Sequence, residues 1–328
     1  MPSERALLFC QDNVLAGRSD LEVDYISTGP SITPGARAYA ESATGLTKQL
    51  NRAASRVLFR QYDYILLPAI NLSWPWDRSR KKHLRDLVKI LLAMIRTARV
   101  RPFGKKPVVA IMDRYDDPNL HMEVPCTTRA DLYFKSNLRP SLEGTLPFQV
   151  RPLPLWLFQE KYPDISPEKT ADVFYCADNN SSHRRHVLNE LPALIALGVI
   201  VDHPQKRIPF PEFVERMSRA AITLSPTGYG YNGFRHYEAM LMKSVPAINE
   251  YHEPIGTDLV KDENYLVYNS NVQGDFIRTI SRALETRPYL LKWGQALRPF
   301  TLERHTISAV GDYLLAELRR FKAAKAGR

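Results

Sequence analysis

Two stretches of the sequence place arginines where a helix is expected to begin. One, SPTGYGYNGFRHYEAML (225–241), has Arg235 after three glycines, and the other, SSHRRHVLNEL (181–191), has Arg184 and Arg185 in its first turn. A helix N-terminus carries about half a positive unit charge, so a basic residue there costs roughly a few tenths of a kcal/mol. An anion at each start would make both arrangements favourable, because free backbone N–H groups and a guanidinium would meet the same oxygens. We expect that anion to be a phosphate.

The loops before these helices suit close approach to a ligand. Three glycines let the second loop bend sharply without a Cβ in the way, and Ser181 or Ser182 is a plausible N-cap of the first helix. Both loops follow predicted parallel strands, and open α/β sheets bind ligands at the carboxyl ends of their strands. A purely structural role stays open for each start, because glycine loops and surface arginines are common. The expected ligand-binding residues here are Ser182, Arg184, Arg185, Thr227, Gly228, Gly230, Gly233 and Arg235.

Glu238 lies three residues after Arg235 and therefore on the same face of the helix. A carboxylate beside a phosphate site would ordinarily repel its ligand. It is useful there if it accepts hydrogen bonds from the vicinal hydroxyls of a ribose or a sugar, as acidic residues do in dinucleotide sites. The alternative is a plain surface ion pair between Arg235 and Glu238, worth under about 1 kcal/mol.

Short apolar runs in the first half predict buried parallel strands. Between the second and third runs, residues 80–100 repeat leucines, valine and isoleucine at helical spacing, long enough for a helix that crosses back over a sheet. The expected strands are 5–10, 62–70, 107–113, 130–137 and 148–154.

The second half alternates strands and helices more regularly, after a proline-containing and charged linker near 158–170. The fold class we predict is α/β, with two Rossmann-like domains facing a cleft: an N-terminal acceptor domain (1–160) and a C-terminal donor domain (171–328), whose last helix is able to pack back on the first. The expected strands are 171–176, 198–203, 221–226, 245–250 and 264–269, and the expected helices are 183–197, 211–220, one from 235, one from 274, and 307–321.

The net charge and the cysteine content of the chain indicate which partners and which cellular compartment to expect. The chain has 45 Lys and Arg against 35 Asp and Glu, a net charge of +10 that favours nucleotides, nucleic acid or an acidic membrane. Cys10, Cys126 and Cys176 are far apart and odd in number, which indicates a reducing cytosol. The start MPSERALLFCQDNV fits neither a signal peptide nor a membrane anchor, and no apolar run is long enough to span a bilayer. We expect a cytoplasmic protein.

A basic helix leaves peripheral membrane contact open. Its charged residues surround an apolar stripe, which suits docking on anionic lipid at the inner face of a membrane, although many such runs are solvated faces. Trp74 and Trp76 precede it and would suit either a bilayer interface or an acceptor-sugar cleft. The basic residues are Arg78, Arg80, Lys81, Lys82, Arg85, Lys89, Arg96, Arg99 and Arg101.

With these residues in view, the second half resembles the nucleotide-sugar domain of GT-B glycosyltransferases over roughly residues 171–285. The resemblance is carried by a strand ending in Ser-Pro, the glycine loop, the RHYEA helix start, the VPAIN strand and the later NYLVY strand. It is closest to the bacterial CgeB-like spore-coat and exostosin-like transferases. The resemblance implies that arginines meet the diphosphate and that Glu238 meets the ribose or the donor sugar, with Ser182 and Arg184 matching the domain's first helix.

The chain departs from the family pattern at two points. Many retaining members carry a second glutamate in an E-x7-E arrangement, whereas the next acid after Glu238 is Glu250. Ser244 stands where a glycine is usual before the Pro-Ala-Ile strand. Inversion and retention of the anomeric configuration therefore both stay open.

The sequence predicts chemistry without a metal or another cofactor. The Asp-x-Asp motif after a strand and His-rich clusters are missing, and helix dipoles with arginines can stabilise a leaving diphosphate instead. A base near the acceptor would come from the first domain, with Asp12 and Asp113 as candidates at predicted strand ends. Asp113 heads the run DRYDD (113–117), which would also suit a solvated turn. His121 and His236 are further candidates.

The expected function is transfer of a sugar from a nucleotide-sugar donor to a glycan, lipid-linked or cell-envelope polysaccharide acceptor. One alternative is a DNA-modifying glucosyltransferase of the same fold, in which the positive charge would meet the duplex backbone. Another is a non-catalytic nucleotide-binding or nucleic-acid-binding α/β protein. Few aromatic and basic residues interleave in a recognisable nucleic-acid motif, which disfavours that alternative.

Overall fold

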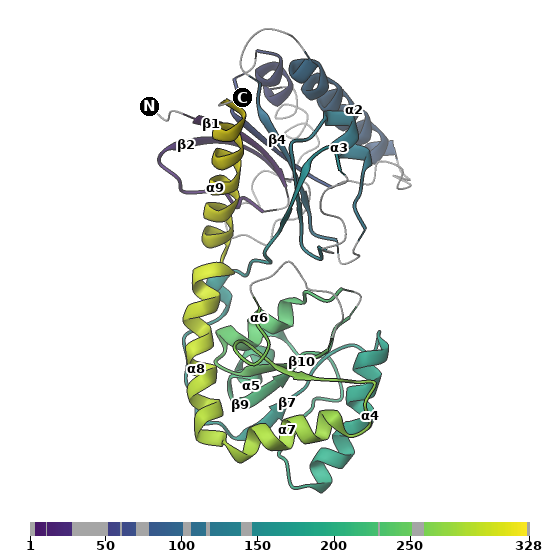
Figure 1. The fold of residues 1–328 in the computed structure, drawn as a ribbon, viewed down its shortest axis with the longest axis vertical. Helices are drawn as coiled ribbons and strands as arrows, with labels where there is room; N and C mark the ends of the chain where they lie inside the picture. The colour runs from purple at the N-terminus through teal and green to yellow at the C-terminus, as the bar shows by residue number, and fades with distance from the viewer. Residues whose placement is uncertain are drawn as a thin grey trace. The chain divides into compact units, whose positions relative to one another are not determined.

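The apolar runs of the sequence form parallel strands in a computed structural model of the chain. The structure describes residues 4–10, 12–27, 52–59, 61–69, 79–100, 106–115, 119–138, 146–228, 230–250 and 259–326, with the side chains of the helix at 79–100 described from residue 89. The chain divides into two units (Figure 1). Unit 1 contains Met1–Tyr115, Asn119–Leu153 and Val310–Arg328, and unit 2 contains Asp116–Pro118 and Pro154–Ala309.

Unit 1 contains a six-stranded sheet in the order β2-β1-β3-β4-β5-β6, with every pair parallel. The chain moves from β1 outward to the edge strand β2 and then crosses back to β3, so the strand order reverses between β1 and β3. Such a reversal is a common ligand position in doubly wound sheets. The strands are β1 Glu4–Cys10, β2 Leu21–Ser27, β3 Tyr64–Pro68, β4 Val108–Asp113, β5 Leu132–Lys135 and β6 Gln149–Pro152.

The two faces of this sheet are covered by different helices, because side chains alternate along a strand. Leu7, Ile65 and Val109 belong to one buried cluster with residues of α2 (Ser79–Val100). On the other face, the Phe134 ring lies 6.1 Å from Tyr313 of α9 (Ile307–Ala326). The short α3 (Glu123–Thr128) contacts α2. The last helix therefore packs on unit 1 from Val310 onward.

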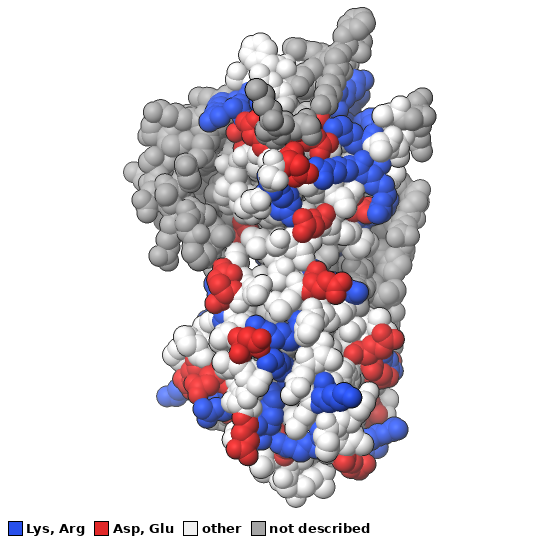
Figure 2. Space-filling model, turned by 90° about the vertical axis from the view of Figure 1, so that its left-hand side faces the viewer, with Lys and Arg blue, Asp and Glu red and all other residues white. Residues whose placement is uncertain are grey.

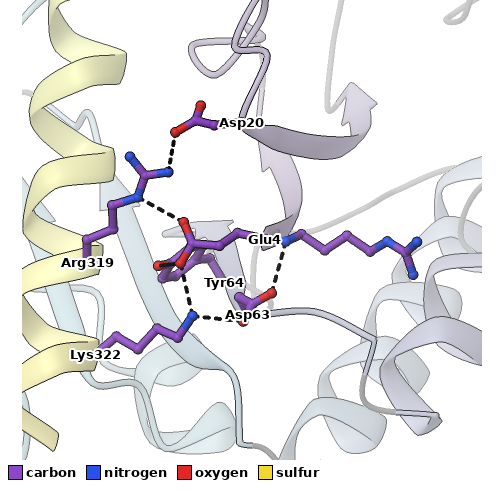
Figure 3. Close-up of polar contacts among 7 residues, drawn as sticks. Glu4, Asp20, Asp63, Tyr64, Arg319 and Lys322 are labelled. Carbon is purple, nitrogen blue, oxygen red and sulfur yellow. Dashed lines mark hydrogen bonds and ion pairs between the residues drawn. The ribbon is translucent and has the colours of Figure 1, made fainter. Parts of the chain in front are cut away.

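Charged side chains fasten α9 to the start of this sheet (Figure 3). Arg319 Nε and Lys322 Nζ contact the Glu4 carboxylate at 2.8 and 2.9 Å, and Lys322 Nζ also contacts Asp63 at 2.9 Å. The Tyr64 hydroxyl donates a further hydrogen bond to Glu4. Because Glu4 opens β1 and Asp63 directly precedes β3, one helix face is held to two neighbouring strands.

Replacing Glu4 by glutamine is expected to lower the unfolding free energy by about 1–2 kcal/mol at pH 7, because charged hydrogen bonds are lost. Burial alone would raise the pKa of Glu4, but hydrogen bonds from Tyr64, Lys322 and Arg319 outweigh it and lower that pKa below its ordinary value. A lowered carboxylate pKa contributes stability above the unfolded-state pKa, and this stability is lost as the pH falls through the folded-state pKa. The difference between wild type and Glu4→Gln in urea unfolding should therefore shrink on acidification.

The matched control for this prediction is Glu215→Gln, which removes an exposed pair with Arg219 on a helix of unit 2. That change should cost less than about 0.5 kcal/mol. Equal losses in the two variants at pH 7 would show that the contacts of Glu4 do not hold α9 in place.

Unit 2 contains a five-stranded parallel sheet in the order β11-β10-β9-β7-β8. Here the order reverses between β7 and β9, which makes the loops after these two strands the expected ligand position. The strands are β7 Ala171–Phe174, β8 Val201–Asp202, β9 Ala220–Leu224, β10 Val245–Asn249 and β11 Leu266–Tyr268.

The helices of unit 2 cover this sheet, with α6 packed on α8 and α4 packed on α7 (Figure 1). The prediction of two Rossmann-like α/β domains is confirmed. The sequence did not indicate β2 or α8, and residues 158–170, expected as a linker, belong to unit 2. The helices are α4 Ser182–Ala196, α5 Phe210–Ser218, α6 Phe234–Leu241, α7 Asp275–Glu285 and α8 Arg287–Arg304.

Charged side chains of both signs lie on the face of the molecule drawn in Figure 2. Within the basic helix for which the sequence leaves membrane docking open, Lys89 and Arg96 are exposed, whereas Arg99 pairs with Asp131. Trp74, Trp76 and the basic side chains before Lys89 lie outside the described residues, as does Arg101. None of the described helices is long and apolar enough to cross a membrane.

Candidate functional site

The two helix starts singled out in the sequence meet at the reversal of strand order in unit 2. Ser181, not Ser182, caps α4: its Oγ accepts a hydrogen bond from the Arg184 backbone N–H at 3.2 Å. The same Oγ donates to the Thr227 carbonyl at 2.8 Å, in the loop after β9. Ser182 is exposed in the first turn of α4. Ser181 therefore caps α4 and also binds the glycine loop that leads into α6.

Buried side chains fix the glycine loop from several sides. Asn249 ends β10 and is fully buried, and its Oδ1 accepts hydrogen bonds from the Thr227 backbone N–H at 2.8 Å and the Thr227 hydroxyl at 3.1 Å. Tyr237 of α6 donates to Asn232 Oδ1 at 2.8 Å. A loop held in this way can present backbone N–H groups to a ligand without reordering when the ligand binds.

His236 also binds the glycine loop, and its surroundings do not suit a general base. Its Nε2 lies 2.9 Å from the Tyr231 carbonyl, and its Nδ1 lies 2.7 Å from Ser225 Oγ. A carbonyl only accepts, so Nε2 carries the hydrogen and Nδ1 accepts one from Ser225. Complete burial lowers the pKa of His236 to about 4, against the raising effect of the bond to Tyr231. The ring is therefore neutral near pH 7, and both of its nitrogens have hydrogen-bond partners within the protein.

Arg184 lies across the glycine loop, and Arg185 does not. Arg184 Nη1 donates to the Asp178 carbonyl at 3.2 Å and to Asn180 Oδ1 at 2.9 Å. A Cβ placed on Gly228 would lie 2.9 Å from Arg184 Nη2, so a larger residue there would push the guanidinium aside. Arg185 is exposed and lines neither cavity described below.

Two cavities meet at Arg235 and Glu238, which line both. The first, of about 380 Å³, contains the glycine loop, with Gly228, Gly230 and Gly233, together with Arg184. The second, of about 620 Å³, extends from the carboxyl end of β7 to the start of α5. Its walls include Cys176, Asp178, His203, Lys206, Arg207, Phe210 and Phe213.

Arg235 and Glu238 form an ion pair, but a partly buried one. Arg235 Nε lies 3.3 Å from Glu238 Oε2, with the two side chains 28% and 15% exposed. Arg235 Nη1 donates to the Cys176 carbonyl, and its guanidinium lies 4.6 Å from the centre of the Phe213 ring. These contacts leave Nη2 of Arg235 without a partner among the described residues. The surface-pair alternative therefore accounts for only part of the arrangement.

The two acids proposed as bases lie in unit 1 and are buried. Asp113 is fully buried in an ion pair of 3.0 Å with Lys135, itself fully buried, and it also accepts hydrogen bonds from the Tyr133 hydroxyl and the Tyr115 backbone N–H. Asp12 is 1% exposed and pairs with Arg114 Nη1 at 3.1 Å. The geometry thus favours structural roles for Asp12 and Asp113 over proton transfer, and the Asp113 side chain is buried and not solvated.

The remaining candidates are less informative. The His121 ring stands 4.5 Å from the Tyr115 ring, in unit 1. Asp116 and Asp117 lie outside the described residues. In the part of the chain that the structure describes, no group of three or more His, Cys, Asp or Glu side chains could hold a metal ion.

No protein-family model and no curated protein matches this sequence. Solved structures match over nearly the whole chain. They include the N-terminal domain of trehalose-6-phosphate phosphatase from Candida albicans (TM-score 0.55, 12% identity, 97% of each chain) and sucrose-phosphate synthase from Thermosynechococcus elongatus (TM-score 0.50, 13% identity, 98% of this chain and 89% of that one). A third is the lipopolysaccharide outer core galactosyltransferase WaaB (TM-score 0.53, 11% identity, 94% and 97%).

The fold is that of GT-B glycosyltransferases. Several residues of the candidate site were not singled out in the sequence, and most of them come from segments distant from the two helix starts. Tyr162 reaches Glu238 from 76 residues earlier, and no local motif marks it. Phe213 lies under Arg235 from an ordinary amphipathic helix start. Asn249 did have a signal, as a polar residue at the carboxyl end of an apolar strand.

Proposed function

We propose that this protein is a glycosyltransferase that takes a sugar from a nucleotide-sugar donor bound in unit 2. One observation carries the proposal. The N-termini of α4 and α6 and the side chains of Arg184 and Arg235 all lie at one glycine loop, where the strand order reverses. Glu238 lines the same cavity. Helix dipoles, backbone N–H groups and guanidinium groups together form a strong anion site. A diphosphate is the anion that also explains a carboxylate at its edge, because a nucleotide sugar adds hydroxyls for that carboxylate to bind.

The two cavities suggest how the donor lies. The diphosphate would occupy the cavity at the glycine loop, and the nucleoside would occupy the larger cavity, where the exposed ring of Phe210 offers aromatic surface. Arg235 and Glu238 stand between them and would meet the phosphates and the ribose hydroxyls, respectively. Nucleotide bases stack well on aromatic faces, which supports this direction over the reverse.

The residues in unit 2 would promote departure of the nucleoside diphosphate. The bond between the anomeric carbon and the diphosphate oxygen breaks, an acceptor hydroxyl oxygen forms the new bond to that carbon, and the hydroxyl proton passes to the departing diphosphate or to water. Negative charge then grows on the diphosphate, where the α4 and α6 dipoles, Arg184 and Arg235 would stabilise it. We include in the proposal that no metal ion is needed for this step.

The acceptor proposed is a glycan, a lipid-linked sugar or a cell-envelope polysaccharide. The names of two structural neighbours, a lipopolysaccharide outer core galactosyltransferase and a sucrose-phosphate synthase, refer to saccharide products. The proposal includes peripheral contact with an anionic membrane, where the protein would meet a lipid-linked acceptor.

Incubation with a panel of nucleotide sugars tests the proposal, with release of nucleoside diphosphate followed by chromatography. We expect at least one donor to be cleaved, slowly alone and faster with a saccharide acceptor, and equally well with EDTA present. Lack of turnover of every donor would contradict the transferase assignment. Inhibition by EDTA, reversed by a divalent cation, would contradict only the metal-independent step.

A further inference from the structure

Tyr162 contacts the candidate site from outside both ligand-binding loops. It lies in the segment by which the chain enters unit 2, it is 4% exposed, and its hydroxyl donates to Glu238 Oε1 at 2.8 Å. The other carboxylate oxygen, Oε2, is held by Arg235 Nε at 3.3 Å. Glu238 is therefore fixed from both sides, and the unused lone pairs of its two oxygens have set directions.

Tyr162 is itself held in place at both ends. Its ring meets the Phe210 ring edge-on at 5.5 Å, and its carbonyl accepts a hydrogen bond from Arg298 Nη2 at 3.1 Å. Arg298 is 6% exposed and its Nη1 donates to the Leu241 carbonyl at the end of α6. One guanidinium therefore ties the backbone at Tyr162 to the end of the helix that carries Glu238.

The hydroxyl remains a donor throughout the pH range of an assay. Burial, followed by the nearby Glu238 carboxylate, raises the pKa of Tyr162 well above its ordinary value. With this donor always present on Oε1, the remaining lone pairs of the carboxylate face the ligand as acceptors.

We propose that Tyr162 is a positioning residue for ribose recognition: it orients the Glu238 carboxylate so that two oxygens accept hydrogen bonds from the vicinal 2′- and 3′-hydroxyls of the donor nucleotide. This inference rests on the proposed function. Fixed acceptors discriminate strongly against a ligand that lacks the matching hydroxyls, because they are then left unpaired in a partly buried site. A carboxylate free to turn toward Arg235 would discriminate less.

Tyr162→Phe tests this directly, because it keeps the ring and its contact with Phe210 and removes only the hydroxyl. The probes are UDP, ADP and GDP and the 2′,3′-dideoxy analogue of each. Each compound is titrated separately into the protein, and the affinities of the two members of a pair are compared. In the wild type, the nucleotide that binds should do so at least about tenfold more tightly than its dideoxy analogue. In Tyr162→Phe that ratio should fall by about fivefold or more, mainly through weaker binding of the ribose form.

The matched control is Tyr313→Phe in unit 1, which removes a hydroxyl that donates to the Pro152 carbonyl at 2.9 Å. It should leave both affinities and their ratio unchanged. If Tyr162→Phe weakens the ribose and dideoxy forms equally, its role is structural and the inference is wrong.

Circular dichroism will show whether Tyr162→Phe folds like the wild type. If it does not, a second variant tests the same inference. Glu238→Ala removes the oriented group itself and should lower the same ratio at least as far; an unchanged ratio would overturn the inference. Failure of the proposed function has a different signature, because then no nucleoside diphosphate binds even the wild type.

Discussion

Replacing Arg235 by alanine is expected to weaken nucleoside diphosphate binding by about 100-fold or more, near 3 kcal/mol. The variant loses a guanidinium that faces both cavities. It also leaves the Glu238 carboxylate uncompensated beside the diphosphate, so repulsion adds to the lost attraction. Titration calorimetry with the nucleotide that binds the wild type most tightly measures the change.

The control for this prediction is Arg185→Ala, which removes an equal charge from the first turn of α4. Arg185 is exposed and lines neither cavity, so its loss should change the affinity by less than about twofold at physiological salt. Comparable losses in both variants would mean that general positive charge, and not a built site, attracts the nucleotide. Unchanged binding by Arg235→Ala would remove the central assignment.

Replacing Gly311 by alanine is expected to destabilise unit 1 by about 3 kcal/mol, although alanine normally favours a helix. Gly311 is buried in α9, and a Cβ there would lie 1.8 Å from the Val14 carbonyl oxygen and 2.6 Å from Arg18 Nη2. The nearest atom belongs to the backbone and Val14 is itself buried, so α9 would have to move away. Urea unfolding followed by circular dichroism measures the loss.

Ala316→Gly, at an exposed position of the same helix, separates packing from helix propensity. It should cost no more than about 1 kcal/mol, the usual propensity difference between the two residues. A Gly311→Ala variant as stable as the wild type would show that the helix does not approach Val14 as closely as described.

The architecture could be predicted where the sequence is most apolar. Strands such as β4 are buried on both faces, so they appear as continuous apolar runs whatever their neighbours are. The edge strand β2 carries Glu22 and Asp24, which pair with arginines, and it therefore lacks that signal. Helix α8 contains Pro288 and Pro299, which obscure a helical pattern that packing on α6 stabilises.

The candidate site could be predicted only as far as its local parts. The arginines, the glycines and Glu238 lie within two short loop–helix segments, so their spacing alone brings them to the helix starts. Asp113 was predicted as a candidate base because its ion-pair partner cannot be read from the local sequence: Lys135 is its neighbour in register on β5. The contacts that fix the site, from Tyr162 and Asn249, depend on tertiary packing between distant segments.

Titration calorimetry of the wild-type protein with UDP, ADP, GDP and inorganic pyrophosphate, all in EDTA, tests the central claim most directly. The claim is that the glycine loop, Arg184, Arg235 and Glu238 form a nucleoside diphosphate site. It predicts that at least one nucleotide binds one site per chain with a dissociation constant below about 1 mM, and more tightly than pyrophosphate, because the nucleoside adds its own contacts. If none of the nucleotides binds at that concentration, or if pyrophosphate binds as well as all of them, the account is contradicted.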